Sequence, residues 1–123
     1  MKTINEMRET VQQFLIANGF DQDNYFHDFD TYHFPNKADI VTEKYFNEFA
    51  NKEIERSRYE GRCVMVQELY RSNGSEANQS IQIDIVDWHG SSGHRIFREK
   101  IYSRHGEKKT NSVLASLLET YHS

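Results

Sequence analysis

The chain has 123 residues, a formal net charge of −4, and 13% aromatic residues. This length fits one domain over residues 1–123, and the aromatic content argues against disorder. The single cysteine, Cys63, excludes an internal disulfide. No stretch reaches the roughly 18 apolar residues of a membrane span. The N-terminus lacks the apolar run of a signal peptide, so no signal peptide is predicted. We therefore expect a cytoplasmic protein with no membrane partner.

Charge is distributed unevenly along the chain. Residues 1–60 contain 12 acidic side chains and 7 Lys or Arg, whereas residues 61–123 contain 7 and 8. This asymmetry predicts two electrostatically different faces, one acidic and one mildly basic. A protein that binds nucleic acid over most of its surface is usually more basic than this.

The first predicted helix begins near Thr3. Thr3 and Glu6 have the spacing of a capping box, in which each side chain accepts from the other residue's backbone N–H. Gly19 is placed to end the helix in the left-handed conformation, with Phe20 as its hydrophobic contact. The apolar residues between them recur at helical spacing and predict a core-facing stripe: Ile4, Met7, Val11, Phe14 and Leu15.

Residues 21–36 allow more than one structure. Their aromatic side chains are spaced by three and four, which permits a helix, but the same letters permit a strand. We predict a short helix or irregular segment that ends at Phe34, because Pro35 disfavours the helical conformation in the residue before it.

A second long helix is predicted over residues 36–61. Asn36 can cap its N-terminus, Val41, Tyr45 and Phe49 form an apolar stripe, and Gly61 ends the run.

The pattern then changes to that of strands. We predict strands at residues 62–71, 80–88 and 95–102, with an exposed loop at 72–79, a hairpin loop at 89–94 and a turn at 104–111. Ile81, Ile83 and Ile85 alternate with Gln82, Asp84 and Val86, which indicates one buried and one wet face.

A last helix is predicted after Thr110, Asn111 or Ser112. The expected fold is α+β, in the order α-(α)-α-β-β-β-α. A three-stranded antiparallel meander packs against two long N-terminal helices, with a short element between them, and one C-terminal helix.

The stretch from Asp23 to Asn36 combines aspartates with aromatic residues. Its two histidines do not converge on a helix, and its aspartates lack the rest of a calcium loop, so no metal is predicted here. Aromatic side chains supply contact area, and carboxylates complement a basic partner. We predict a partner-binding surface made of Asp23, Tyr25, Asp28, Asp30 and Tyr32.

Two alternative sites lie in the second half of the chain. Asp87, His89 and His94 flank a hairpin loop and could hold a metal for hydrolase or nuclease chemistry. A basic hairpin could instead contact the phosphates of a nucleic acid directly. Its residues would be Arg95, Arg98, Lys100 and Arg104.

No nucleophile motif, phosphate-binding loop or dinucleotide fingerprint is present, so the sequence predicts no catalytic residue and no cofactor. The leading hypothesis is a small non-enzymatic protein-binding factor of the inhibitor or immunity type, encoded by a phage or bacterium. Its expected partner is a nucleic-acid-handling enzyme or a defence complex that presents a basic surface.

Overall fold

The computed structural model describes residues 2–70 and 78–123, and it contains two helices and six strands in these residues. In chain order they are α1 (Ile4–Ala17), β1 (Asp21–Asp23), β2 (Asp30–His33), β3 (Ala38–Asn47), β4 (Lys52–Leu69), β5 (Ser80–His89), β6 (Ser92–Tyr102) and α2 (Glu107–Tyr121). The prediction of three strands and two long N-terminal helices was therefore wrong. The predicted loop at 72–79 lies mostly outside the described residues.

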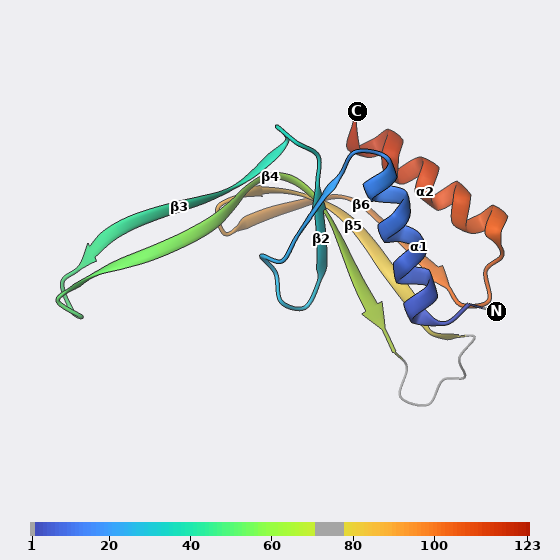
Figure 1. Ribbon diagram of the computed structural model, residues 1–123, viewed down its shortest axis with the longest axis horizontal. Helices are drawn as coiled ribbons and strands as arrows, with labels where there is room; N and C mark the ends of the chain where they lie inside the picture. Colours follow the sequence, from blue (N-terminus) through green and yellow to red (C-terminus); the bar gives the residue numbers. More distant parts are fainter. Residues whose placement is uncertain (1, 71–77) are drawn as a thin grey trace.

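All strand pairs are antiparallel, and the sheet runs in the order β1-β2-β4-β5-β6. β3 is off this path and pairs only with β4 among the described elements. β4 has 18 residues, so its first half extends beyond the body with β3 while its second half lies inside the sheet. Figure 1 shows the resulting shape, in which β3 and the start of β4 project from a compact body as a long hairpin.

Helix α1 confirms the predicted caps. The Thr3 side chain accepts from the backbone N–H of Glu6, and the Glu6 carboxylate accepts from that of Thr3. At the other end Gly19 has a φ of 90°, and Phe20 N–H donates to the Leu15 carbonyl at 3.0 Å. These bonds satisfy backbone groups that a helix end otherwise leaves unpaired.

Helix α2 begins earlier than predicted. Gly106 is its N-cap, so the residues Glu107–Lys109, expected to form a turn, make its first turn instead. Glu107 lies in that turn, where the helix dipole favours a negative charge. Neither described helix is long and apolar enough to cross a membrane.

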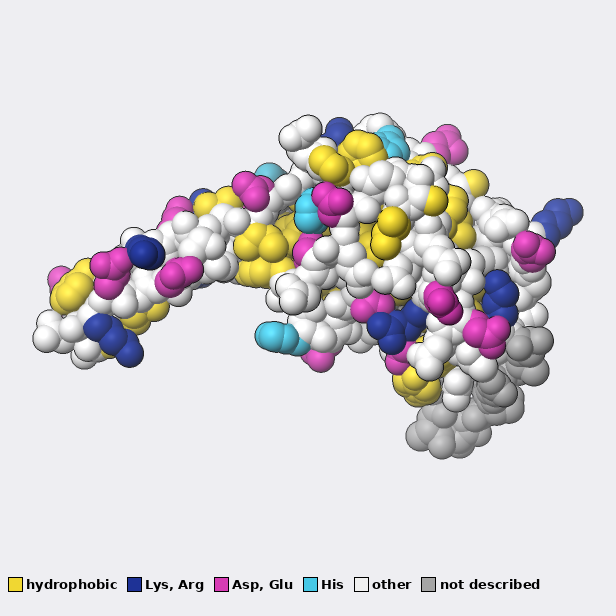
Figure 2. Space-filling model, viewed as in Figure 1, with side chains coloured by type: hydrophobic (Ala, Val, Ile, Leu, Met, Phe, Trp, Pro, Cys, Tyr) yellow, Lys and Arg dark blue, Asp and Glu magenta, His cyan; other side chains and the backbone are white. Residues whose placement is uncertain are grey.

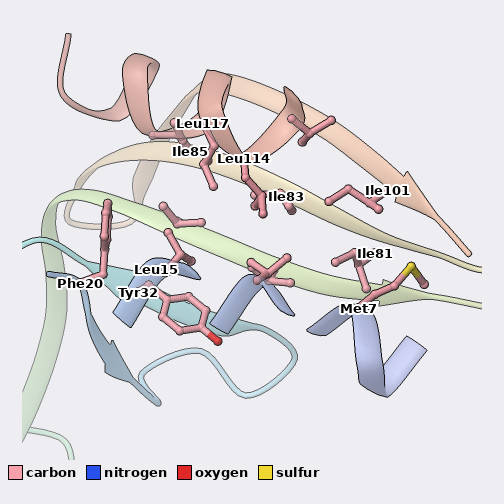
Figure 3. Close-up of a cluster of buried hydrophobic side chains, with 14 of the residues drawn as sticks. Met7, Leu15, Phe20, Tyr32, Ile81, Ile83, Ile85, Ile101, Leu114 and Leu117 are labelled. Carbon is pink, nitrogen blue, oxygen red and sulfur yellow. The ribbon is translucent and has the colours of Figure 1, made fainter. Parts of the chain in front are cut away.

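Both helices cover the same face of the sheet and form the main core (Figure 3). Ile81, Ile83 and Ile85 are fully buried there, as the alternation of β5 predicted. They meet Leu15 of α1 and Leu117 of α2, which are also completely buried. Roughly 2 kcal/mol is gained for each such side chain removed from water, so this layer contributes strongly to the fold's stability.

The opposite face carries a smaller cluster. Tyr59, Cys63, Met65 and Val86 are buried in it under the chain between β1 and β2, with Phe26 stacked on the indole of Trp88 at 5.1 Å between ring centroids. Val86 therefore lies in a second core and not on a wet face. The six residues 24–29 that connect β1 to β2 cover this face, which the predicted fold left without a covering element.

The predicted helix at 36–61 is the β3–β4 hairpin. A spacing of four residues fits one face of a helix, but it also fits one face of a strand, whose side chains repeat every two residues. Val41, Tyr45 and Phe49 were therefore ambiguous. The turn is fixed locally: the Asn47 side chain accepts from Ala50 N–H at 3.0 Å, and Asn51 has a φ of 50°.

Residues 21–36 form two short strands, β1 and β2, so the short helix was also wrong. β2 inserts beside β4, with Thr31 opposite Met65 and Tyr32 opposite Val64. This long-range pairing decides the conformation, because a four-residue segment has no stable helix of its own. The predicted boundary at Phe34 is confirmed, since β2 ends at His33.

The β5–β6 hairpin was predicted, but its loop is shorter than the expected 89–94, because β5 continues to His89 and β6 begins at Ser92. Its register shifts by one residue between Ile85 and Val86, where β6 accommodates Ile96 as an extra residue. Phe97 and Ile101 lie on the same side of this irregularity and both face the helices, opposite Ile85 and Ile81.

We expect the fold to lose stability steeply at alkaline pH. Burial raises the pKa of Tyr32 and of Tyr121 to about 12, and that of Cys63 from 9.0 to about 12. Each folded pKa lies above its unfolded value. The stabilisation is therefore complete below about pH 9 and is lost as the pH rises through 12.

Tyrosinate absorbance checks this expectation when it is followed together with circular dichroism. Burial also raises the pKa of Tyr59, so of the seven tyrosines Tyr32, Tyr59 and Tyr121 should ionise only as the helical signal disappears. Full ionisation of all seven in a protein that is still folded would contradict the burial of these three rings.

Candidate functional site

The most exposed apolar surface lies on the projecting hairpin. We call this element the arm: strand β3, the turn 48–51, and residues 52–59 of β4. Phe49 in the turn is 103% exposed, Phe46 is 60% exposed and Tyr45 is 46% exposed. Such large apolar side chains are rarely left in water on a free-standing element unless they meet a partner. Figure 2 shows hydrophobic side chains along the arm and at its base.

The register assigns the arm's side chains to two faces. One face carries Val41, Glu43 and Tyr45 opposite Arg58, Arg56 and Ile54. The other carries Ile40, Lys44 and Phe46 opposite Tyr59, Glu55 and Glu53. Both faces therefore mix aromatic or aliphatic groups with charges of both signs, and neither has the continuous apolar stripe that packs on a core.

The arm is anchored to the body by Tyr59. Its ring is 1% exposed and packs against Tyr25 and Phe26, with ring centroids 5.6 and 5.7 Å away. Tyr25 reaches further along the arm and donates from its hydroxyl to the Ser57 carbonyl at 2.9 Å. The base of the arm is thus held firmly, while its outer half has no contact beyond its own two strands among the described residues.

A glycine marks the point where the arm leaves the body. Gly61 has a φ of 107° and pairs with Ala38 of the arm on one side and Trp88 of β5 on the other. A Cβ at this position would lie 2.2 Å from the Lys37 carbonyl oxygen, which instead accepts from Arg62 N–H at 3.0 Å. Glycine is the residue that allows these two segments of the backbone, at Lys37 and at Gly61, to cross so closely.

The predicted acidic and aromatic residues do not share one surface. Asp23 is a structural carboxylate: its oxygens accept from the Tyr59 hydroxyl at 3.0 Å and from Tyr25 N–H at 3.1 Å, and one lies 2.8 Å from His33 Nδ1. Its side chain is only 11% exposed. Tyr25 packs over Tyr59, so of these two residues neither presents a free aromatic or acidic group.

The other three predicted residues lie elsewhere. Asp30 accepts two bonds from the Arg8 guanidinium, at 2.9 and 3.0 Å, and Arg8 also pairs with Glu68 at 2.8 Å. Tyr32 is 1% exposed inside the main core, on the side of the sheet that the helices cover. Asp28 is exposed in the loop between β1 and β2. Of the five, Asp28 alone is free to meet a partner.

The proposed metal ligands are also engaged or separated. His94 lies opposite Asp87, and His89 lies opposite Ser92. The prediction that the two histidines face each other across the strands was therefore wrong. Both Asp87 oxygens accept from Arg62, at 2.7 and 3.0 Å, and this ion pair lowers the pKa of Asp87. Among the described residues, no group of three His, Cys, Asp or Glu side chains could hold a metal ion.

Of the four predicted basic residues, Arg95, Arg98 and Lys100 lie on β6 and Arg104 follows it in the chain, and Arg98 and Arg104 have partners within the protein. Arg98 donates twice to Asp84, at 2.8 and 3.0 Å, and Arg104 lies 4.2 Å over the ring of Tyr102. Arg95 and Lys100 are opposite Val86 and Gln82. The side chains of Arg98 and Arg104 are therefore held at the protein surface by intramolecular contacts.

Comparisons with protein-family models, curated proteins and solved structures found no match. The sequence interpretation missed the arm because it assigned the whole stretch to a helix. The signal that favours the hairpin is a β-branched run, Ile40-Val41-Thr42, followed by two asparagines at the turn: Asn47 directly before the four-residue turn 48–51, and Asn51 as its last residue.

Proposed function

We propose that this chain is a non-enzymatic protein-binding factor and that the arm is its binding element. The observation that carries the proposal is the complete exposure of Phe49 at the end of a two-stranded arm, with Phe46 and Tyr45 half exposed behind it. Aromatic side chains dominate the energy of protein interfaces, because they bury a large area at low entropic cost.

The edges of the arm support the same proposal. An isolated two-stranded hairpin is at best marginally stable, and each free edge presents unpaired N–H and C=O groups to another strand. A partner that adds a strand or a pocket for the aromatic side chains would satisfy both needs. A small factor of this shape would act by occupying a surface of its partner, as inhibitors and immunity proteins do.

A nucleic-acid partner for the arm is disfavoured by charge. Residues 38–59 contain five acidic side chains and four Lys or Arg, so the arm has no excess of positive charge to neutralise phosphates. A cytoplasmic location is part of the proposal and is supported by the one cysteine, Cys63, which is buried and unpaired.

Capture from the native host, with mass spectrometry, tests the proposal. Replacing Phe46 and Phe49 by serine should reduce recovery of a specific partner at least tenfold, since the loss of two aromatic contacts costs about 1–2 kcal/mol each or more. Stability should change by less than about 0.5 kcal/mol, because both side chains are exposed.

Two further variants make the result specific. Tyr70→Ser removes an aromatic side chain that is 62% exposed but lies off the arm, and it should leave capture unchanged. Asp28→Lys reverses the one exposed acid of the originally predicted surface. Loss of the partner with Asp28→Lys, and its retention with the arm variant, would move the binding site from the arm to that loop.

A further inference from the structure

We propose that the arm pairs with the arm of a second copy of this chain, edge to edge along β3, in an antiparallel register centred on Glu43. This inference rests on the proposed role of the arm as the binding element and names the partner of one of its edges. The two arms then form one four-stranded sheet with a body at each end.

The outer edge of β3 is open along ten residues. β3 pairs only with β4 among the described strands, and it contains no proline and no bulge, two devices that commonly block an edge. Ile40 N–H donates to the carboxylate of its neighbour Asp39, at 2.8 Å, and not to another strand. The edge of β4 is less accessible, because the Tyr25 hydroxyl already bonds the Ser57 carbonyl there.

Self-pairing of identical antiparallel strands restricts the choice of register. The two-fold axis is perpendicular to the sheet, so residues that face each other must lie on the same face of β3. Near the middle of the strand this leaves registers centred on Thr42, Glu43 or Lys44. The side-chain pattern distinguishes the three.

The register centred on Glu43 places Val41 opposite Tyr45 of the copy and Ile40 opposite Phe46 of the copy. The axis repeats each pair, which gives four apolar cross-strand contacts, two on each face. Centring on Thr42 would place Ile40 opposite Lys44, and centring on Lys44 would place Glu43 opposite Tyr45. Apolar pairs stabilise a sheet relative to such mismatched ones.

Charge is compatible with the Glu43 register. The two Glu43 side chains face each other, and such a like-charge pair would be unfavourable by itself. Each Glu43 carboxylate, however, already lies 2.7 Å from the Arg58 guanidinium of its own arm, and Arg56 stands opposite it in the hairpin. Arg58 also lies 2.8 Å from Glu60, so with Glu60 counted the centre of the pairing has as many acids as arginines.

The ends of the pairing fit as well. Asn47 comes opposite Asp39 of the copy, so the turn with Phe49 lies at the base of the other arm. An open hollow occurs there, lined by Asn36, Lys37, Ala38, Asp39, Glu60 and Gly61. This hollow would cover the side chain of Phe49, which is fully exposed in the single chain.

Disulfide trapping tests the register directly. Glu43→Cys places two thiols on directly opposed residues, whose Cα atoms would be about 4.5–5.5 Å apart, within the range that a disulfide spans. Copper-catalysed air oxidation, in which oxygen accepts the two electrons, should convert most of the protein to a covalent dimer. The native Cys63 is completely buried and does not interfere.

Glu55→Cys is the matched control on the neighbouring strand. Its exposed position would be three strand spacings, about 14 Å, from its copy, too far for a disulfide. Faster trapping of Thr42→Cys or Lys44→Cys than of Glu43→Cys would overturn the register. Equal trapping of Glu43→Cys and Glu55→Cys would show random collision and would overturn the pairing itself.

Sedimentation equilibrium of the unmodified chain provides the second measurement. The mass should rise from one chain to two with concentration, and Tyr45→Lys should weaken association about tenfold, since the symmetry counts each lost contact twice. Tyr70→Ser should have no effect.

The two proposals fail in different ways. A monomer at every concentration, with capture still lost in the Phe46 and Phe49 variant, would overturn self-pairing and leave the binding role of the arm intact. If the covalent dimer forms but the replacement of Phe46 and Phe49 does not change the recovery of captured partners, self-pairing stands and the binding of a different protein through the arm is overturned.

Discussion

Gly61→Ala should lower the free energy of unfolding by about 3 kcal/mol, more than most single substitutions in this chain. Two costs combine. A φ of 107° is strained for any residue with a Cβ, and that atom would lie 2.2 Å from the Lys37 carbonyl oxygen. Strain and overpacking each cost roughly 1–3 kcal/mol. Urea unfolding followed by circular dichroism measures the sum.

Gly90→Ala separates the two costs. Gly90 has a φ of 63° in the turn between β5 and β6, but an added Cβ meets no atom closer than 3.8 Å. This variant should therefore lose only the backbone contribution, about 1 kcal/mol. Equal losses of stability in Gly61→Ala and Gly90→Ala would mean that the backbone at Lys37 moves away from an added Cβ at little cost. The close crossing at Gly61 would then not fix the base of the arm.

Asp23→Ala should destabilise the protein by about 3 kcal/mol, whereas Asp28→Ala should change stability by less than about 0.5 kcal/mol. Removal of the Asp23 carboxylate leaves the Tyr59 hydroxyl without its acceptor in a nearly closed environment and removes the partner of His33 Nδ1. Asp28 is already exposed to water, so removing its side chain disrupts little buried structure. Thermal and urea unfolding of both variants provides the comparison.

This pair of variants also determines what the acidic stretch does. Tyr59→Phe should cost about 1–2 kcal/mol, less than Asp23→Ala, because it removes one bond to the carboxylate and leaves the other two. If Asp23→Ala kept its stability but lost a partner, the carboxylate would belong to a binding surface and the structural role assigned to it here would be wrong.

Local signals in the sequence predicted the elements whose neighbours in space are also neighbours in sequence. The Thr3–Glu6 box and Gly19 define α1, because caps depend on a few adjacent residues. Strict alternation at Ile81, Ile83 and Ile85 defined β5 and its buried face. The hairpin to β6 followed from a glycine-containing turn between two β-branched segments.

The errors lie where the local pattern fits two structures. Residues 36–61 have apolar positions spaced by four, which suits a helix or a strand, and charged residues between them, which suit either exposed face. β1 and β2 are only three and four residues long, and they exist because β4 offers an edge to pair with. No window of the sequence contains that information.

The candidate site shows the same division. Composition indicated that the aromatic and acidic side chains of residues 23–32 are available for binding, but most of these side chains are buried or paired. Burial and bonding decided which of them are free: Tyr32 entered the core, Asp23 and Asp30 were paired, and Phe46 and Phe49 remained in water on the arm.

By itself, the sequence determined a single α+β chain with a capped N-terminal helix, a C-terminal helix and a core built on an isoleucine strand. The tertiary structure alone decided that β4 is long enough to serve both the body and the arm, and that the arm is exposed. The physical reason is that helix caps and strand alternation are short-range properties. Strand pairing, in contrast, depends on which distant edge remains free once the core has formed.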